Sequence, residues 1–302
     1  GSDESGPVLL ITTDLIGVSS TLTERLARRL ARRTSLDRER LTLTVTHTHT
    51  GPMVSGVLPY IFGESIPRAH QEQIDAYTNR LLDELENLAV EALAARRPAV
   101  LAWGKGSAGF AVNRRVVEEG RWTGFGIDPD GVVDLDLPVL VARSPDGTLR
   151  AVFLSYACHN TTLGPDFNRI HGDWAGMAQA LIEERHPEAT VLVATGAGGD
   201  ANPQPRGELS HVHVHGRTIA AEVEHLIQDG LRPLDEPPTA RLRTIDLPLQ
   251  NVPSREELRE RAKREGAEGL YAASLLDSLE AGEPVPNQIA DYPVQVWTFG
   301  EE

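Results

Sequence analysis

The sequence contains one cysteine, Cys158, which excludes a disulfide within the chain and leaves the cellular compartment undecided. Basic residues are also scarce: 29 lysines and arginines stand against 44 acidic residues, for a net charge of −15. Such a chain cannot neutralise many phosphates, which argues against a nucleic-acid or anionic-membrane partner. No apolar run approaches the ~20 residues of a membrane-spanning helix, so we expect no integral membrane segment. Internal repeats and low-complexity segments are absent as well.

The composition is otherwise that of a globular protein, with 40% hydrophobic and 24% charged residues. A chain of 302 residues is long enough for one large α/β domain or two smaller ones. Its opening, Gly-Ser-Asp-Glu-Ser-Gly, is typical of a cut or tagged start, and the strand pattern at 294–299 runs almost to the last residue. We therefore expect the chain to be a piece of a longer protein.

The order of predicted elements indicates an α/β fold. An apolar run at 7–13, an amphipathic helix and a strand at 41–46 predict a β-α-β unit, which brings Asp14 and His47 to one sheet edge. Two strand patterns around the turn at 144–147 predict a hairpin, so the sheet is mixed. The other patterns predict helices at 68–97, 173–185, 212–228, 254–265 and 267–281, and strands at 99–104, 190–195, 239–249 and 294–299.

Two histidines follow the second strand, in Thr46-His47-Thr48-His49-Thr50-Gly51-Pro52. Residues two apart on a strand lie on the same face, so His47 and His49 are expected to project together. Converging imidazoles suit a zinc site, or one ligand beside a proton carrier. A pair of surface histidines bonded to hydroxyl groups is the alternative.

A third histidine, His159, ends a later apolar strand and repeats the arrangement at His47. Two strand-end histidines far apart in sequence are typical of a metal site assembled by the fold. Asp14, Asp173 and Asp200 lie at comparable edges, where each could hold an imidazole or act as a general base. Capping and turn formation are the alternatives, and for Asp173 the N-cap of a helix is favoured.

The glycine-rich loop at 196–203 lacks the G-K-[ST] ending and the G-x-G-x-x-G spacing of phosphate loops. We interpret it as a tight crossing that brings backbone N–H groups and Asp200 close to a ligand, as in an oxyanion hole. Arg114 and Arg115 could clamp a polar substrate group or form surface ion pairs.

Two further features are assigned no role. His211 and His215 share a face of the helix predicted at 212–228, but no carboxylate or cysteine is spaced to complete a metal site there. Cys158 points to the opposite strand face from its neighbour His159, which disfavours a thiol nucleophile.

Four segments, in the same order, resemble the neutral/alkaline ceramidases, the non-lysosomal zinc amidases. The segment 46–52 is similar to the family's Thr-His-Thr-His-Ser-Gly-Pro motif, and Val112-Asn113-Arg114-Arg115 resembles its Asn-Arg segment. The segment 156–164, with Gly172-Asp173 downstream, resembles its second histidine segment, and 196–203 resembles its Gly-Asp loop. The resemblance implies a mixed β-sheet core flanked by helices, built as one ceramidase-like catalytic domain over 1–302, in which 204–302 is placed by continuity.

The resemblance also implies roles for single residues. Zinc would be the cofactor, with His47 and His159 as ligands and His49 as the neighbouring acid/base or substrate-orienting histidine. Arg114 would contact the polar head of the substrate, and Asp200 and Asn202 would complete the catalytic set. The implied reaction is hydrolysis of an N-acyl amide by water that the metal activates.

The chain departs from the family in two respects. Ceramidases proper carry Gly-Asp-x-Ser-Pro-Asn with a serine tied to activity, whereas Asn202 stands at that position here. Asparagine can donate to an oxyanion but cannot act as a nucleophile, so water must attack. In this respect the chain looks closer to small bacterial ceramidase-like proteins, whose substrates need not be ceramides. The family's remaining ligands, a glutamate and a tyrosine, come after the point where this chain stops.

Two alternatives stay open. A metal hydrolase of the amidohydrolase barrel type also uses a strand-end H-x-H, although the hairpin counts against eight β-α repeats. A degenerate binding domain would account for Asn202 and for the missing ligands. The expected partner is a small-molecule or lipid amide, and the oligomeric state is not predicted. The resemblance implies a secreted or periplasmic protein, although this chain shows no signal peptide.

Overall fold

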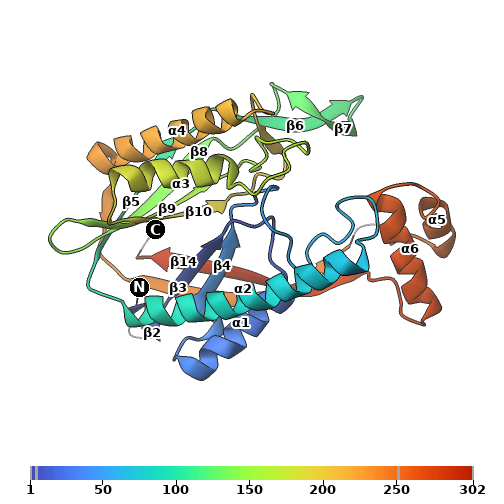
Figure 1. The fold of residues 1–302 in the computed structure, drawn as a ribbon, viewed down its shortest axis with the longest axis horizontal. Coiled ribbons are helices and arrows are strands. Elements are labelled where there is room, and N and C mark those ends of the chain that lie inside the picture. Colours follow the sequence, from blue (N-terminus) through green and yellow to red (C-terminus); the bar gives the residue numbers. More distant parts are fainter. Residues whose placement is uncertain (1, 4–5, 250–251, 301–302) are drawn as a thin grey trace.

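The computed structural model describes residues 2–3, 6–249 and 252–300 (Figure 1). Its helices are α1 (Ser20–Arg33), α2 (Arg68–Ala94), α3 (Asp173–Arg185), α4 (Leu209–His225), α5 (Arg255–Arg261) and α6 (Ala267–Glu280), with short helical turns at Arg38–Arg40 and Leu226–Gly230. Its strands are β1 (Ser2–Asp3), β2 (Gly6–Pro7), β3 (Leu9–Thr13), β4 (Leu41–Val45), β5 (Val100–Ser107), β6 (Ala111–Glu118), β7 (Arg121–Asp128), β8 (Asp136–Arg143), β9 (Leu149–Tyr156), β10 (Thr190–Thr195), β11 (Ala201–Pro203), β12 (Arg232–Leu234), β13 (Pro238–Pro248) and β14 (Gln288–Phe299).

The predicted mixed α/β architecture is confirmed. The largest sheet has the order β10-β9-β8-β5-β12, in which β9 and β10 run parallel and the other neighbours antiparallel. The predicted hairpin is formed by β8 and β9. Smaller sheets pair β3 with β4 and β13 with β14, and a three-stranded sheet has the order β11-β6-β7. The described strands therefore do not close into a (β/α)8 barrel, and the barrel alternative is wrong.

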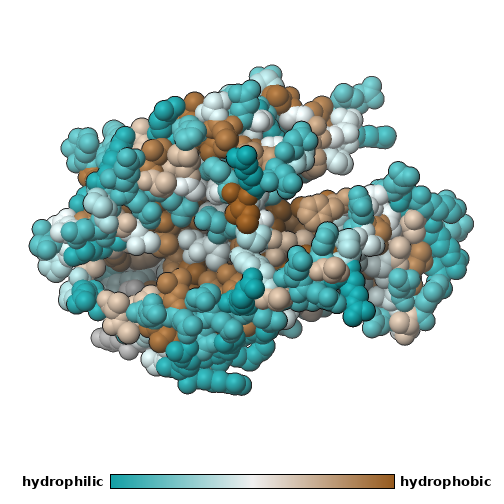
Figure 2. Space-filling view, viewed as in Figure 1, coloured by the Kyte–Doolittle hydropathy of each residue, from teal (hydrophilic) through white to brown (hydrophobic). Residues whose placement is uncertain are grey.

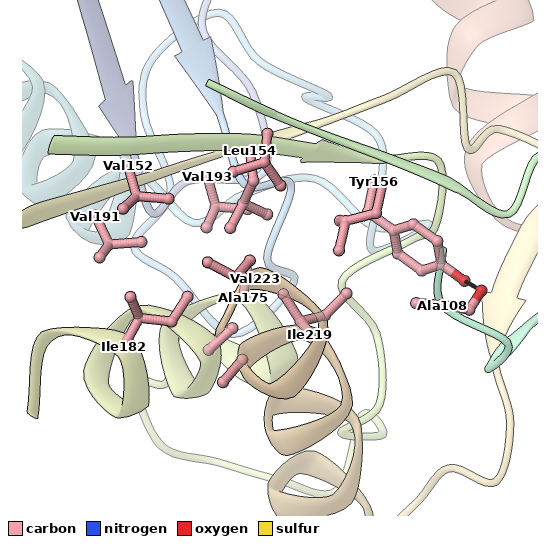
Figure 3. Close-up of a cluster of buried hydrophobic side chains, with 14 of the residues drawn as sticks. Ala108, Val152, Leu154, Tyr156, Ala175, Ile182, Val191, Val193, Ile219 and Val223 are labelled. Carbon is pink, nitrogen blue, oxygen red and sulfur yellow. Dashed lines mark hydrogen bonds between the residues drawn. The ribbon is translucent and has the colours of Figure 1, made fainter. Parts of the chain in front are cut away.

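The main core lies between the large sheet and the helices α3 and α4, which cover one of its faces (Figures 1 and 3). Alternate residues of β9 point into this core, because side chains of a strand alternate between its two faces. Val152 and Leu154 meet Val191 and Val193 of the parallel neighbour β10. Burial of each such side chain contributes about 1.5–3 kcal/mol. The Tyr156 hydroxyl, inside the same core, donates to the Ala108 carbonyl at 2.6 Å.

The predicted β-α-β unit is also confirmed, with β3 and β4 in parallel register. Leu22, Leu26 and Leu30 recur at the helical period on the buried face of α1 and pack against α2. The predicted helix at 68–97 ends earlier, at Ala94, so the chain leaves the helix before the proline at 98.

The elements that matter for function meet at one edge. β3 and β4 lie beside β10, so the ends of both parallel pairs open toward the same side of the molecule. β13 and β14 form a long ribbon that lies beside the large sheet at one end and leads to α5 and α6 at the other (Figure 1). There the Tyr271 ring of α6 approaches Tyr60, in the loop before α2, at 6.2 Å between ring centroids. No described helix is long and apolar enough to span a bilayer.

Candidate metal centre

Three histidines from two distant segments come together at this edge. The Nε2 atoms of His47 and His49 are 3.3 Å apart. The His159 ring lies 4.8 Å from that of His47 and 5.8 Å from that of His49, between centroids. One ligand nitrogen from each residue falls within 4.8 Å of the others. The structure therefore brings His47, His49 and His159 into one cluster.

The local geometry at His47 differs from the sequence prediction. β4 ends at Val45, so the two histidines do not project from one strand face. His47 instead has φ of 60°, in the left-handed region that non-glycine residues enter at a cost of ~1–3 kcal/mol. The turn at His47, rather than strand alternation, directs its imidazole toward that of His49.

Asn160 joins the two histidine segments. An isolated parallel bridge pairs Thr48 with Asn160, and the His49 N–H donates to the Asn160 carbonyl. The Asn160 side chain accepts from the Ala175 N–H and donates to the Gly172 carbonyl, at 3.2 and 2.9 Å. These bonds attach both segments to the start of α3, within the main core.

The three threonines that alternate with the histidines, Thr46, Thr48 and Thr50, also have hydrogen-bond partners. Thr48 and Thr50 both donate through their hydroxyl groups to the His171 carbonyl, at 2.9 and 2.7 Å. The Thr46 hydroxyl donates to the Asp14 carboxylate at 3.1 Å. The motif therefore alternates two kinds of residue: histidines facing the cluster and threonines fixing the loop.

Backbone carbonyls orient the imidazoles. His47 Nδ1 lies 2.6 Å from the Ile16 carbonyl, and His159 Nδ1 lies 2.7 and 3.1 Å from the carbonyls of Gly198 and Ala201. A carbonyl oxygen can only accept, so each Nδ1 carries the proton and each Nε2 keeps its lone pair. This arrangement is common around metal-binding histidines.

Two aspartates considered for that orienting role serve other bonds. The Asp14 carboxylate accepts from Thr46, and burial raises its pKa. The buried Asp173 carboxylate accepts from the backbone N–H groups of Leu163 and Trp174. Asp173 is the first residue of α3, one position inside the N-cap predicted for it. Neither carboxylate has a hydrogen bond to a histidine of the cluster within the described residues, and backbone carbonyls take the Nδ1 positions of His47 and His159.

Two imidazoles of the cluster, those of His49 and His159, are held in the neutral form. Burial lowers the pKa of His159 to about 4, and the Arg114 charge acts in the same direction. The His49 ring keeps access to solvent on one side, yet desolvation by the surrounding residues lowers its pKa to about 4. The neighbouring imidazoles of His47 and His159 and the charges of Arg114 and Arg206 act in the same direction. Metal ions bind the neutral form of histidine.

The donor set fits a metal ion. Imidazole nitrogens suit zinc and other first-row transition metals. Two nitrogen ligands of a tetrahedral zinc ion, each ~2.0–2.1 Å from it, lie ~3.3 Å apart, which matches the Nε2 pair of His47 and His49. The three-histidine cluster could therefore bind a metal. The resemblance implied an acid/base or substrate-orienting role for His49, whereas the structure also places it among the candidate ligands.

The other predicted site residues lie around the cluster. Arg114 is on β6, where its Nε donates to the Gly199 carbonyl at 3.1 Å and its guanidinium stacks over Phe125 at 4.3 Å. The Asp200 carbonyl accepts from the Arg114 N–H, and its carboxylate is outside the histidine group. Asn202 is buried in β11, where its side-chain oxygen accepts from Thr161 at 3.4 Å. Their catalytic roles remain predictions.

A groove of about 640 Å³ opens beside the cluster. His49 lines it together with the loop before α2, the loop before α3, and Arg206. Figure 2 shows apolar residues around the hollow between the lobe of α3 and α4 and the arm that ends in α6. Sequence reasoning missed Arg206, and its place directly after the glycine-rich loop was the one signal available.

The histidines of α4 are separate from this cluster. His211, His213 and His215 all lie inside α4, which begins at Leu209, earlier than predicted. His215 is buried, stacks on Phe110 at 4.3 Å and donates from Nε2 to the Pro205 carbonyl at 2.7 Å. Burial raises the pKa of the Cys158 thiol far above its usual range, so Cys158 is an inert core residue, as expected.

His215 leads to a prediction about stability and pH. Burial lowers its pKa, an effect that the Asp173 charge partly opposes. In the unfolded chain His215 takes up a proton near pH ~6.5, whereas the buried ring of the folded chain stays neutral at that pH. The free energy of unfolding is therefore highest above that pH and decreases as the pH falls toward the folded-state pKa. Urea unfolding between pH 8 and 5 should therefore show a steeper loss for the wild type than for His215→Gln. Parallel curves for the two proteins would contradict this assignment.

Comparison with known proteins identifies the fold of the chain but not its family. No protein-family model and no curated protein matches the chain. The neutral ceramidase from Pseudomonas aeruginosa matches it with a TM-score of 0.67 and 17% identity, over 97% of this chain and 53% of that one. A ceramidase complexed with C2 matches with a TM-score of 0.67 and 16% identity, over 97% and 54%. The chain therefore has the ceramidase fold and spans about half the length of those proteins.

Proposed function

We propose that the protein is a zinc-dependent hydrolase that cleaves the amide bond of an N-acyl substrate. The observation that carries this proposal is the cluster of His47, His49 and His159, in which one ligand nitrogen of each residue lies within 4.8 Å of the others. Burial lowers the pKa of both His49 and His159 to about 4, which keeps these two rings neutral near pH 7. The ceramidase fold supports the proposal, because ceramidases hydrolyse an amide. The apolar groove beside the cluster supports an acyl chain as part of the substrate.

The three histidines of the cluster would have different chemical roles. His47 and His159 would hold zinc, since the carbonyls of Ile16, Gly198 and Ala201 fix their Nδ1 protons. Bound zinc polarises an amide carbonyl and makes water a nucleophile at neutral pH. His49 would carry a proton from water to the leaving nitrogen. Water forms the new C–O bond, the C–N bond breaks, and the products are a carboxylate and an amine.

Arg114 and Asn202 would bind substrate. Arg114 is oriented by its bond to Gly199, beside the loop that holds His159. Asn202 can donate a hydrogen bond to the oxygen that gains charge as water attacks. Such a bond stabilises the transition state more than the ground state and so lowers the barrier.

The test is amide hydrolysis by the zinc-loaded protein. We expect release of free fatty acid from a panel of N-acyl amides that includes a short-chain ceramide, measured by mass spectrometry, with His159→Ala as the background. Stoichiometric zinc without cleavage above that background would instead favour a binding domain.

A further inference from the structure

We propose that the groove beside the histidine cluster takes an amide whose amine portion carries a carboxylate, that is, an N-acyl amino acid. The inference rests on the proposed amidase function and names its substrate class. It starts from a contrast of charge between this groove and the rest of the molecule.

The chain carries an excess of acidic residues, 44 against 29 basic, yet no aspartate or glutamate lines the groove in the part of the chain that the structure describes. Its charged lining, among the described residues, consists of two arginines, Arg169 and Arg206, and the His49 imidazole lines the same groove. A random sample of this surface would be acidic. The groove is therefore a local basic site in an acidic protein, which attracts and orients anions.

Arg114 is a second cation near the His49 ring. Arg206 lines the groove together with His49, and the charges of Arg114 and Arg206 add to the effect of burial in lowering the pKa of His49. The charge of Arg206 also lowers the pKa of Arg114, so the two guanidinium groups repel each other. Arg114 is held by the Gly199 carbonyl and by the face of Phe125. Asp200 partly offsets the charge of Arg114 without forming an ion pair with it in the described part of the chain.

No described carboxylate pairs with Arg206 either, and its side chain makes no hydrogen bond within the described residues. Two arginines that repel each other next to a metal-type site would normally be separated or neutralised. A bound anion would neutralise them, and guanidinium groups bind carboxylates through paired hydrogen bonds.

The apolar part of the groove fixes the remainder of the substrate. Leu58, Ile61, Phe62 and Ile170 line it with large exposed fractions, from 41% for Ile61 to 76% for Ile170. Exposed apolar side chains grouped in one groove mark a binding surface. An aliphatic chain suits these residues, while the anion must stay within a few bonds of the amide at the histidines. An N-acyl amino acid has this layout, because its carboxylate carbon is two bonds from the amide nitrogen.

Calorimetric binding to the zinc-free protein tests this without turnover. The probes are N-lauroylglycine and N-lauroylglycinamide, which differ only in carboxylate against neutral amide. We expect the wild type to bind N-lauroylglycine at least ~10-fold more tightly, and Arg206→Gln to lose most of that difference. The matched control is Arg217→Gln, which removes an equal charge from an exposed arginine of α4 and should keep the difference.

Equal binding of the two probes, no measurable binding of either, or a difference that persists in Arg206→Gln would overturn the inference. The proposed function fails separately. If the zinc-loaded protein binds N-lauroylglycine selectively but cleaves neither probe, the anion site stands and the amidase function falls. If it cleaves both probes equally well, the amidase function stands and the anion site falls.

Discussion

Replacing His47 or His159 with alanine is expected to weaken zinc binding at least ~100-fold, because removal of residues that merely orient a metal ligand already costs ~10–100-fold. Each substitution removes one of the converging Nε2 donors and leaves the other segment in place. The measurement is a competition titration against a chromophoric zinc chelator, which gives stoichiometry and affinity together. The wild type should bind one equivalent.

The matched control is His213→Ala, which removes an exposed histidine on α4, outside the cluster. It should leave zinc affinity unchanged. Equal affinity of the wild type and the two cluster variants, or loss only on removal of α4 histidines, would show that the cluster is not the metal site. His49→Ala adds a distinction: a loss as large as that of His159→Ala makes His49 a ligand, whereas a small loss supports its predicted role in proton transfer.

Substituting alanine for Gly198 is expected to destabilise the protein by about 3 kcal/mol and to weaken zinc binding as well. A Cβ at Gly198 would lie 2.5 Å from the Cys158 nitrogen and 2.7 Å from the Ala157 carbonyl carbon. Backbone atoms at the end of β9 cannot move aside as a flexible side chain can. The loop must therefore shift, and the Gly198 carbonyl that holds His159 Nδ1 shifts with it.

The adjacent glycine provides the control for this prediction. A Cβ at Gly199 meets nothing within 4 Å, so Gly199→Ala should retain the stability and zinc affinity of the wild type. Urea unfolding and the same chelator titration give both readings. Near-identical behaviour of the Gly198 and Gly199 variants would mean that the close packing of this loop does not support the metal site. Loss of stability alone would separate packing from the orientation of His159.

The local prediction succeeded where periodicity and turn chemistry decide the structure. The hairpin of β8 and β9 and the strand Thr190–Thr195 formed as expected, because their apolar faces are buried in the main core. The β3-α1-β4 unit also formed as expected, because its apolar side chains pack with α2 in a second core. Boundaries at helix ends were less certain, as at α2 and α4, because caps and packing against neighbours set them.

The sequence by itself indicated His47 and His159 as candidate ligands, with His49 beside them, because each segment follows an apolar strand pattern. It did not determine their convergence. That required the left-handed turn at His47 and the bridge between Thr48 and Asn160, segments more than a hundred residues apart. The groups that orient the imidazoles could not be read from residue types either, because they are backbone carbonyls, which every residue has. Arg206 could not be identified from the sequence for a related reason. An arginine becomes a candidate site residue only when the fold places it in a groove, and no described carboxylate lines this one. Sequence spacing thus fixes which groups are available, while packing decides which of them meet.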